Sequence, residues 1–182
     1  MSDEEKSVAK PIRGEFLREI VFGANDGVVT SIGFLVGIAG AVSDQTIVVI
    51  AGALTIIAGG ASMALGNYLA VKSQREFYES KEEAHSENNP IISGVIIGAF
   101  YLLGGFPPLL PFILFRPATR ALIMSIIVAI IVMGLIGFMR WTLNRRNLGG
   151  KIGETIIVGI IAAGIGFLAG EVLNYLGLSA AI

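Results

Sequence analysis

The 182-residue sequence contains no cysteine, one histidine and one tryptophan. Without cysteine the chain can form no disulfide, zinc–thiolate site, iron–sulfur cluster or thiol nucleophile. The single histidine, His85, lies in a polar stretch, so neither a His-based zinc site nor a buried Ser–His pair can be built. Phosphate-cradling glycine loops are absent as well. We therefore expect neither an enzyme nor a bound cofactor.

Charged residues are also scarce, at 15% of the sequence, whereas a soluble domain carries about 25%. They fall in short clusters between long uncharged runs, and the mean hydropathy is +0.77. The net charge of -1 gives no reason to expect nucleic acid as a partner. This composition predicts an all-α, polytopic membrane protein, with residues 1–182 forming one transmembrane domain in a lipid membrane.

Long apolar runs predict the membrane-spanning helices, each of which needs about 20 residues to cross the bilayer. The first twenty residues are polar and contain no removable signal sequence. Three prolines between residues 107 and 111 are expected to bend or end the third helix near its far side. The predicted spans number five and cover residues 20–42, 46–71, 90–115, 121–139 and 155–182.

The distribution of Lys and Arg predicts the orientation of these spans. With the amino terminus in the cytoplasm, eleven of the thirteen basic residues lie inside, and only Arg116 and Arg120 lie outside. We therefore expect a cytoplasmic amino-terminal segment over residues 1–15, a cytoplasmic acidic linker over residues 73–89 and an external carboxyl terminus. The linker is either a helical extension of the second span or a solvated amphipathic connector. In a helix, three of its carboxylates would share one stripe: Glu76, Glu79 and Glu83.

Glycine is abundant, with 24 residues, and several pairs have the four-residue spacing that lets membrane helices approach closely. Such pairs argue for tight packing and leave function open. They are Gly23/Gly27, Gly33/Gly37, Gly94/Gly98 and Gly166/Gly170.

Three acidic side chains lie within the predicted spans or at their edge, and an ionisable group inside the bilayer is costly and a candidate for function. Glu154 is expected to pair at the cytoplasmic edge with Lys151, Arg145 or Arg146. Glu171, near the outer end, is expected to meet a basic residue of the outer loop or to reach water. Structural roles are favoured for both.

Asp26 differs because it lies seven residues beyond Glu19, roughly 10 Å into the hydrocarbon, where no Lys or Arg shares its depth. It should hold either a proton or a cation, and these two occupants of one site are the basis of proton–cation exchange. The alternative is a protonated Asp26 hydrogen-bonded between helices. Met63 is predicted at similar depth on the second span, with Asn67 one turn away on the same face.

A carboxylate and a thioether together suit a first-row divalent ion better than Mg²⁺ or Ca²⁺, which prefer oxygen alone. One of each is too few ligands for a cation, so the chemistry favours a homodimer that supplies two sets. The alternatives are a proton-coupled carrier of another small solute and a non-transporting membrane scaffold.

The motifs around these residues resemble the vacuolar iron transporter family. The first span carries REIVFGANDGVVT over residues 18–30, and the second carries AGGASMALGNY over residues 58–68, followed by KSQRE over residues 72–76. Residues 104–111, GGFPPLLP, are similar to the proline-rich end of the family's third helix. The resemblance implies a homodimeric antiporter that moves Fe²⁺, and often Mn²⁺, out of the cytosol in exchange for protons. It also implies a path at the dimer interface, lined by Asp26 and Met63.

The sequence departs from well-known members of that family in two places. It lacks their long Glu-rich cytoplasmic domain and keeps only residues 73–89, as in the shorter nodulin-like branch, so Glu76, Glu79, Glu83 and His85 are candidates for a reduced metal-collecting patch. It also has Thr55 where many relatives carry Glu. The expected location is a prokaryotic cell membrane, or the vacuolar membrane if the source is eukaryotic.

Overall fold

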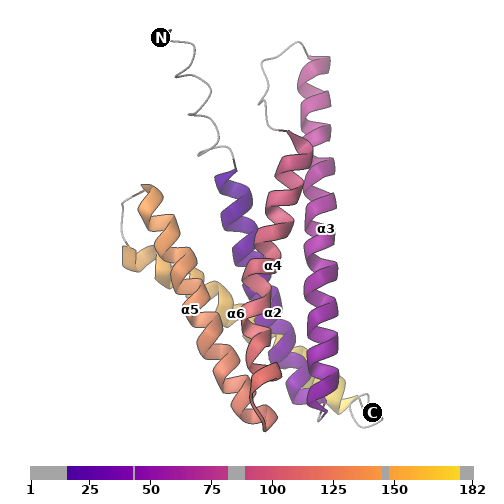
Figure 1. Ribbon diagram of the computed structural model, residues 1–182, viewed down its shortest axis with the longest axis vertical. Coiled ribbons are helices and arrows are strands. Elements are labelled where there is room, and N and C mark those ends of the chain that lie inside the picture. The colour runs from indigo at the N-terminus through magenta and orange to yellow at the C-terminus, as the bar shows by residue number, and fades with distance from the viewer. Residues whose placement is uncertain (1–15, 43, 82–88, 145–147, 177–182) are drawn as a thin grey trace.

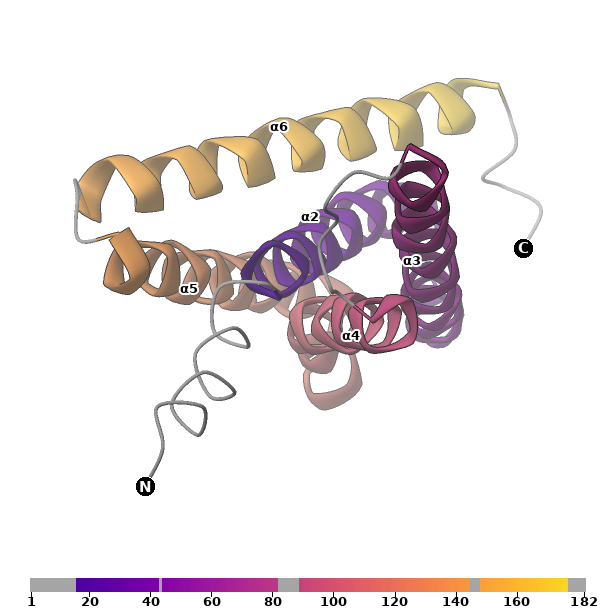
Figure 2. The same cartoon turned by 90° about the horizontal axis from the view of Figure 1, so that it is seen from above.

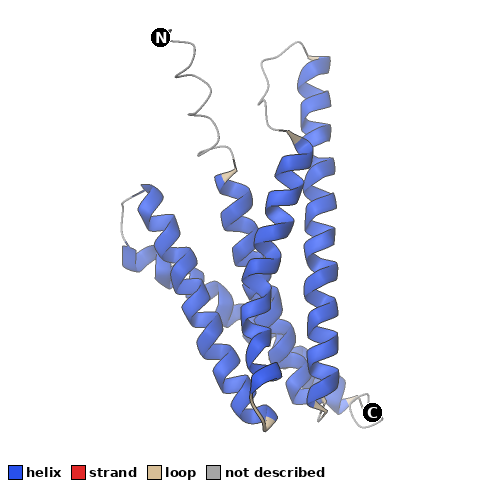
Figure 3. Ribbon diagram, viewed as in Figure 1, coloured by secondary structure: helices blue, strands red, loops and turns tan. Residues whose placement is uncertain are grey.

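A computed structural model describes residues 16–42, 44–81, 89–144 and 148–176. Every regular element in these ranges is a helix (Figure 3). The helices are α2 (Leu17–Ala41), α3 (Gln45–Ser80), α4 (Pro90–Leu114), α5 (Ala118–Asn144) and α6 (Leu148–Tyr175). All five are long and apolar enough to cross a membrane, which confirms the all-α, five-span prediction.

The bundle is built around α2 and α4, which lie side by side and are the most buried of the helices (Figure 1). α3 packs along α4, α5 covers the opposite side, and α6 crosses obliquely over α2 (Figure 2). Successive helices run in alternating directions, so the start of α2 and the end of α6 lie at opposite ends of the bundle (Figure 1). This agrees with an odd number of passes. Which end faces the cytoplasm stays a prediction.

Glycines allow the crossing of α6 over α2. A Cβ atom at Gly166 or Gly170 would collide with the backbone carbonyl oxygen of Gly33 or Gly37, respectively. The two helix backbones therefore touch directly at this crossing, as the four-residue glycine spacing predicts.

Glycine contacts of the same kind join α4 to α2 and to α3. A Cβ at Gly23 or Gly27 of α2 would collide with backbone atoms of α4, at Tyr101 in the case of Gly27. On another face of α4, a Cβ at Gly94 or Gly98 would press against the backbone of α3. The glycine pairs thus fix α2, α3 and α4 at close spacing.

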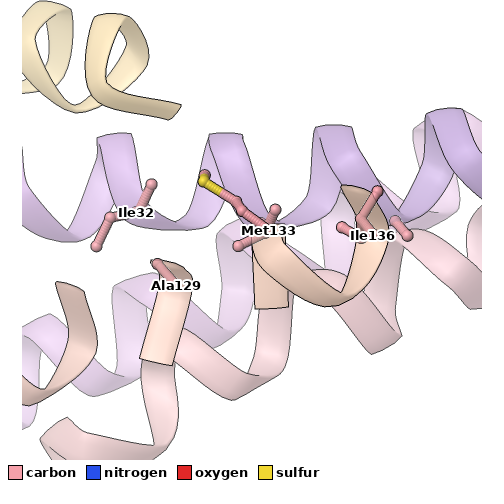
Figure 4. Close-up of a cluster of buried hydrophobic side chains, with 6 residues drawn as sticks. Ile32, Ala129, Met133 and Ile136 are labelled. Carbon is pink, nitrogen blue, oxygen red and sulfur yellow. The ribbon is translucent and has the colours of Figure 1, made fainter. Parts of the chain in front are cut away.

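Apolar side chains fill the space that the glycine contacts leave between the helices. Ile32 of α2 packs with Ala129, Met133 and Ile136 of α5 in one cluster (Figure 4). The Met133 thioether fills the space in front of Gly159 on α6, so this cluster joins three helices. A second cluster, between α2, α3, α4 and α5, contains Leu35, Val48, Ile56, Leu109, Phe112 and Ala121.

The prolines of α4 do not end the helix, which contradicts one of the two predicted outcomes. α4 continues past residues 107–111 to Leu114. Side chains of neighbouring helices donate hydrogen bonds to carbonyl groups in this last part of α4. The Ser125 hydroxyl donates to the Pro108 carbonyl oxygen at 2.6 Å, and the Gln45 amide donates to two carbonyl oxygens at the carboxyl end of α4.

α3 ends later than its predicted span, and α6 begins earlier than its predicted span. α3 runs to Ser80 rather than residue 71, because the chain between Gly66 and Pro90 contains neither glycine nor proline to stop it. The first part of the predicted 73–89 linker is therefore a helical extension. α6 begins at Leu148, seven residues before the predicted start at residue 155. The predicted amino-terminal segment, residues 1–15, lies outside the described residues.

Candidate functional site

A pocket of about 370 Å³ opens between α2, α3 and α4. Asp26 of α2 lines it together with Met63 and Asn67 of α3. The structure thus brings together the three residues of the predicted spans that the sequence analysis proposed as metal ligands. A carboxylate, a thioether and an amide face one space, which is a donor set suited to a divalent transition metal.

Tyr101 of α4 also lines this pocket, and nothing in the sequence indicated it. Its side chain is buried, and its hydroxyl group hydrogen-bonds with the Thr30 side chain. The hydroxyl also lies against Gly59 of α3, where a Cβ would collide with it, and within electrostatic range of Asp26. Tyr101 therefore places a hydroxyl group from α4 near the Asp26 carboxylate.

The pocket carries a carboxylate with no basic side chain beside it. Among the described residues, none of those lining it is Lys, Arg or His, and Asp26 forms no ion pair. Within the described chain, no three His, Cys, Asp or Glu residues gather closely enough to hold a metal ion. One copy of the chain thus offers a single carboxylate at this site.

A buried hydrogen-bonded chain leads away from the pocket, and it too was missed. The Asn67 amide nitrogen donates to the Ser93 hydroxyl at 2.7 Å, and that hydroxyl donates to the Glu19 carboxylate at 3.0 Å. Ser93 is fully buried and Glu19 is 3% exposed. In the sequence, Glu19 serves only as the marker from which the depth of Asp26 is counted.

Comparison with known proteins identifies the family. The sequence pattern of the VIT family matches residues 17–88 and 80–171, which is most of the chain. The chain belongs to the VIT family. It is 25% identical to vacuolar iron transporter 1 of Arabidopsis thaliana over 219 residues, covering 89% of this chain and 88% of that protein. It is 27% identical to vacuolar iron transporter homolog 4 of the same plant (91% and 87% covered) and 24% identical to protein CCC1 of Saccharomyces cerevisiae (90% and 71% covered).

Membership of the VIT family confirms the resemblance and agrees with the prediction that the chain is not an enzyme, since these relatives bear names of transporters or of their homologues. The two matched segments overlap at residues 80–88, from the last residue of α3 to shortly before α4. The alignment with vacuolar iron transporter 1 is longer than this chain, so that relative contains residues that this chain lacks. This agrees with a short form of the family.

The predicted metal-collecting patch is only partly described. Glu76 and Glu79 lie on the extension of α3, where each faces a basic side chain one turn earlier. Lys72 Nζ lies 3.9 Å from Glu76 Oε1, and Arg75 Nε lies 2.8 Å from Glu79 Oε1. Such exposed pairs along a helix account for these two residues without a metal. The remaining candidates, Glu83 and His85, lie outside the described residues, so the patch stays a prediction.

The other two acidic residues within the spans lie away from the pocket. Glu154 lies near the start of α6, where its Oε2 pairs with Arg140 Nη2 of α5 at 3.0 Å. Of the partners predicted for it, Arg145 and Arg146 lie outside the described residues. Glu171 is exposed and forms no ion pair within the described part of the chain. Thr55, one of the two departures noted in the sequence, is half-buried and does not line the pocket.

Proposed function

We propose that this VIT-family protein exports a divalent transition metal, Fe²⁺ or Mn²⁺, from the cytosol in exchange for protons. The observation that carries the proposal is a pocket inside the predicted spans where Asp26, Met63 and Asn67 face one space without a basic residue. The names of the relatives support iron as cargo, because several are called vacuolar iron transporters.

Exchange follows from the Asp26 carboxyl group. In a low-dielectric environment an unpaired carboxylate is unfavourable, so the group binds either a proton or a metal ion. A metal ion that enters from the cytoplasm displaces the proton, and protons from the other side then release the metal. Met63 favours a metal of intermediate softness over Mg²⁺ and Ca²⁺, and Asn67 adds an oxygen ligand. In this scheme the end of the bundle that holds Glu19 and Ser80 faces the cytoplasm.

The proposal includes a homodimer with the two pockets facing each other. One pocket supplies too few ligands for a divalent ion, whereas two copies about a twofold axis supply two of each. Ser62, Gly66 and Ala70 line the pocket, recur every fourth residue along α3 and are exposed in the single chain. Small residues at this spacing let a second helix approach closely in lipid.

The membrane in which the protein resides stays a prediction. A prokaryotic cell membrane was expected from the sequence, or the vacuolar membrane for a eukaryotic source. The vacuolar names of the relatives do not favour the prokaryotic alternative.

The direct test measures metal flux into proteoliposomes under an imposed pH gradient, with internal pH recorded in parallel. Wild-type protein should move Fe²⁺ or Mn²⁺ and protons in opposite directions, and Asp26→Asn should abolish both movements. Asp44→Asn is a matched control, because Asp44 caps α3 at an exposed position and Asn caps helices equally well. Wild-type flux in Asp26→Asn would refute the proposal. Metal movement without proton movement in the wild-type protein would refute the exchange.

A further inference from the structure

Asn67 can serve the proposed metal site only through its amide oxygen, because the amide nitrogen is a donor that repels a cation. The two ends of an amide have nearly the same shape, so a neighbouring group must determine which end faces the pocket. The structure contains such a group on the side of Asn67 that faces α4. There the Asn67 amide nitrogen lies 2.7 Å from the Ser93 hydroxyl oxygen.

The direction of this hydrogen bond is determined by the next one, in which Ser93 donates to Glu19. A hydroxyl group has one proton to donate, and the Ser93 hydroxyl donates it to Glu19 Oε1 at 3.0 Å. The Ser93 oxygen can then only accept, so the partner facing it must be the nitrogen of Asn67. The Asn67 oxygen is thereby left for the pocket, which Asn67 lines.

Burial makes this arrangement specific. Ser93 is 0% exposed and Glu19 is 3% exposed, so water does not provide either side chain with alternative partners. Glu19 also keeps spare acceptor capacity, since Oε2 is buried without a hydrogen-bond partner in the described part of the chain. A buried carboxyl group is costly unless hydrogen bonds compensate for its burial.

We infer that Glu19 and Ser93 are positioning residues that hold the Asn67 amide oxygen toward the metal pocket. This inference rests on the proposed function and adds to it two residues that need not touch the ion. Without Ser93 the amide loses its fixed partner. Without Glu19 the Ser93 proton becomes free to turn toward the Asn67 oxygen, which reverses the amide and presents its nitrogen to the cation.

The test combines single and double variants in the reconstituted full-length protein. Ser93→Ala and Glu19→Met should each weaken the apparent affinity for Mn²⁺ by roughly tenfold, as loss of a partner that orients a metal ligand typically does. Asn67→Ala should weaken it to a similar degree. In the Asn67→Ala background, Ser93→Ala and Glu19→Met should cause no further loss, because the ligand they position is gone.

A matched control and a second measurement separate positioning from loss of structure. Ser125 is as buried as Ser93 and also donates a hydrogen bond, but to α4 away from the pocket, so Ser125→Ala should keep the wild-type affinity. Equilibrium Mn²⁺ binding to the detergent-purified protein should follow the same pattern as flux.

Three results would overturn the inference. The first is unchanged Mn²⁺ affinity in Ser93→Ala, and the second is unchanged affinity in Asn67→Ala. The third is an additional loss when Glu19→Met is combined with Asn67→Ala, because Glu19 would then act on the metal directly. None of these depends on Asp26→Asn, whose flux tests the proposed function separately.

Discussion

The crossing of α2 and α6 predicts opposite effects for alanine at two nearby glycines of α6. A Cβ at Gly166 would collide with the carbonyl oxygen of Gly33 and lie 2.6 Å from its carbonyl carbon. A Cβ at Gly164, two residues earlier, would have no atom within 4 Å. The two substitutions share the helix and the chemical change, so they differ only in what the added methyl group meets.

The size of the effect follows from these contacts. To restore an ordinary carbon–carbon separation of about 3.5 Å, the two backbones must separate by about 1 Å at Gly166, and relief of the closer contact with the carbonyl oxygen requires more. Overpacking of this kind costs about 1–3 kcal/mol of unfolding free energy. Alanine at Gly164 meets nothing and restricts the backbone, so it should leave the stability unchanged or raise it by up to about 1 kcal/mol.

Thermal unfolding of the detergent-purified protein, followed by circular dichroism, measures this difference. For a chain of this size, each kcal/mol corresponds to about 2–4 °C in midpoint. Gly166→Ala should therefore unfold several degrees below the wild type, and Gly164→Ala at or slightly above it. Equal midpoints for the two variants would show that the close approach of α2 and α6 does not contribute to stability.

Two further predictions concern the end of α4 and the proposed dimer. Gln45→Met should lower the unfolding free energy by about 1–3 kcal/mol, because two carbonyl groups at the end of α4 lose the amide donor they share; an unchanged unfolding midpoint would contradict it. Since the chain has no cysteine, a single cysteine at Gly66 should form a disulfide-linked dimer under mild oxidation, whereas one at Ile161, on the exposed face of α6, should not. Equal cross-linking at both positions would contradict the proposed interface.

The helices and part of the site could be predicted because they depend on properties local to the sequence. Apolar runs and the spacing of glycines determine which segments span the membrane and where they approach each other. Asp26, Met63 and Asn67 could be found by their depth and chemistry alone. The boundaries of α3 and α6 were predicted less well, since a helix can continue into water wherever nothing stops it.

The groups from α4 could not be predicted, because their role depends on how that helix is rotated against its neighbours. Tyr101 and Ser93 are ordinary polar residues in an apolar run, and nothing near them in the sequence indicates which face is buried. Glu19 and Ser93 are 74 positions apart, so their hydrogen bond exists only after α2 and α4 pack.

α4 also determines the geometry of the pocket, although the three candidate ligands lie on α2 and α3. Those two helices contact each other much less than either contacts α4. The distance between Asp26 and Met63 is therefore set by two glycine contacts, one at Gly27 against α4 and one at Gly98 against α3. Tyr101, whose backbone is in contact with Gly27, also lines the pocket itself. Widening either contact thus moves one candidate ligand away from the other, which makes the glycines of this bundle part of the site as well as of its packing.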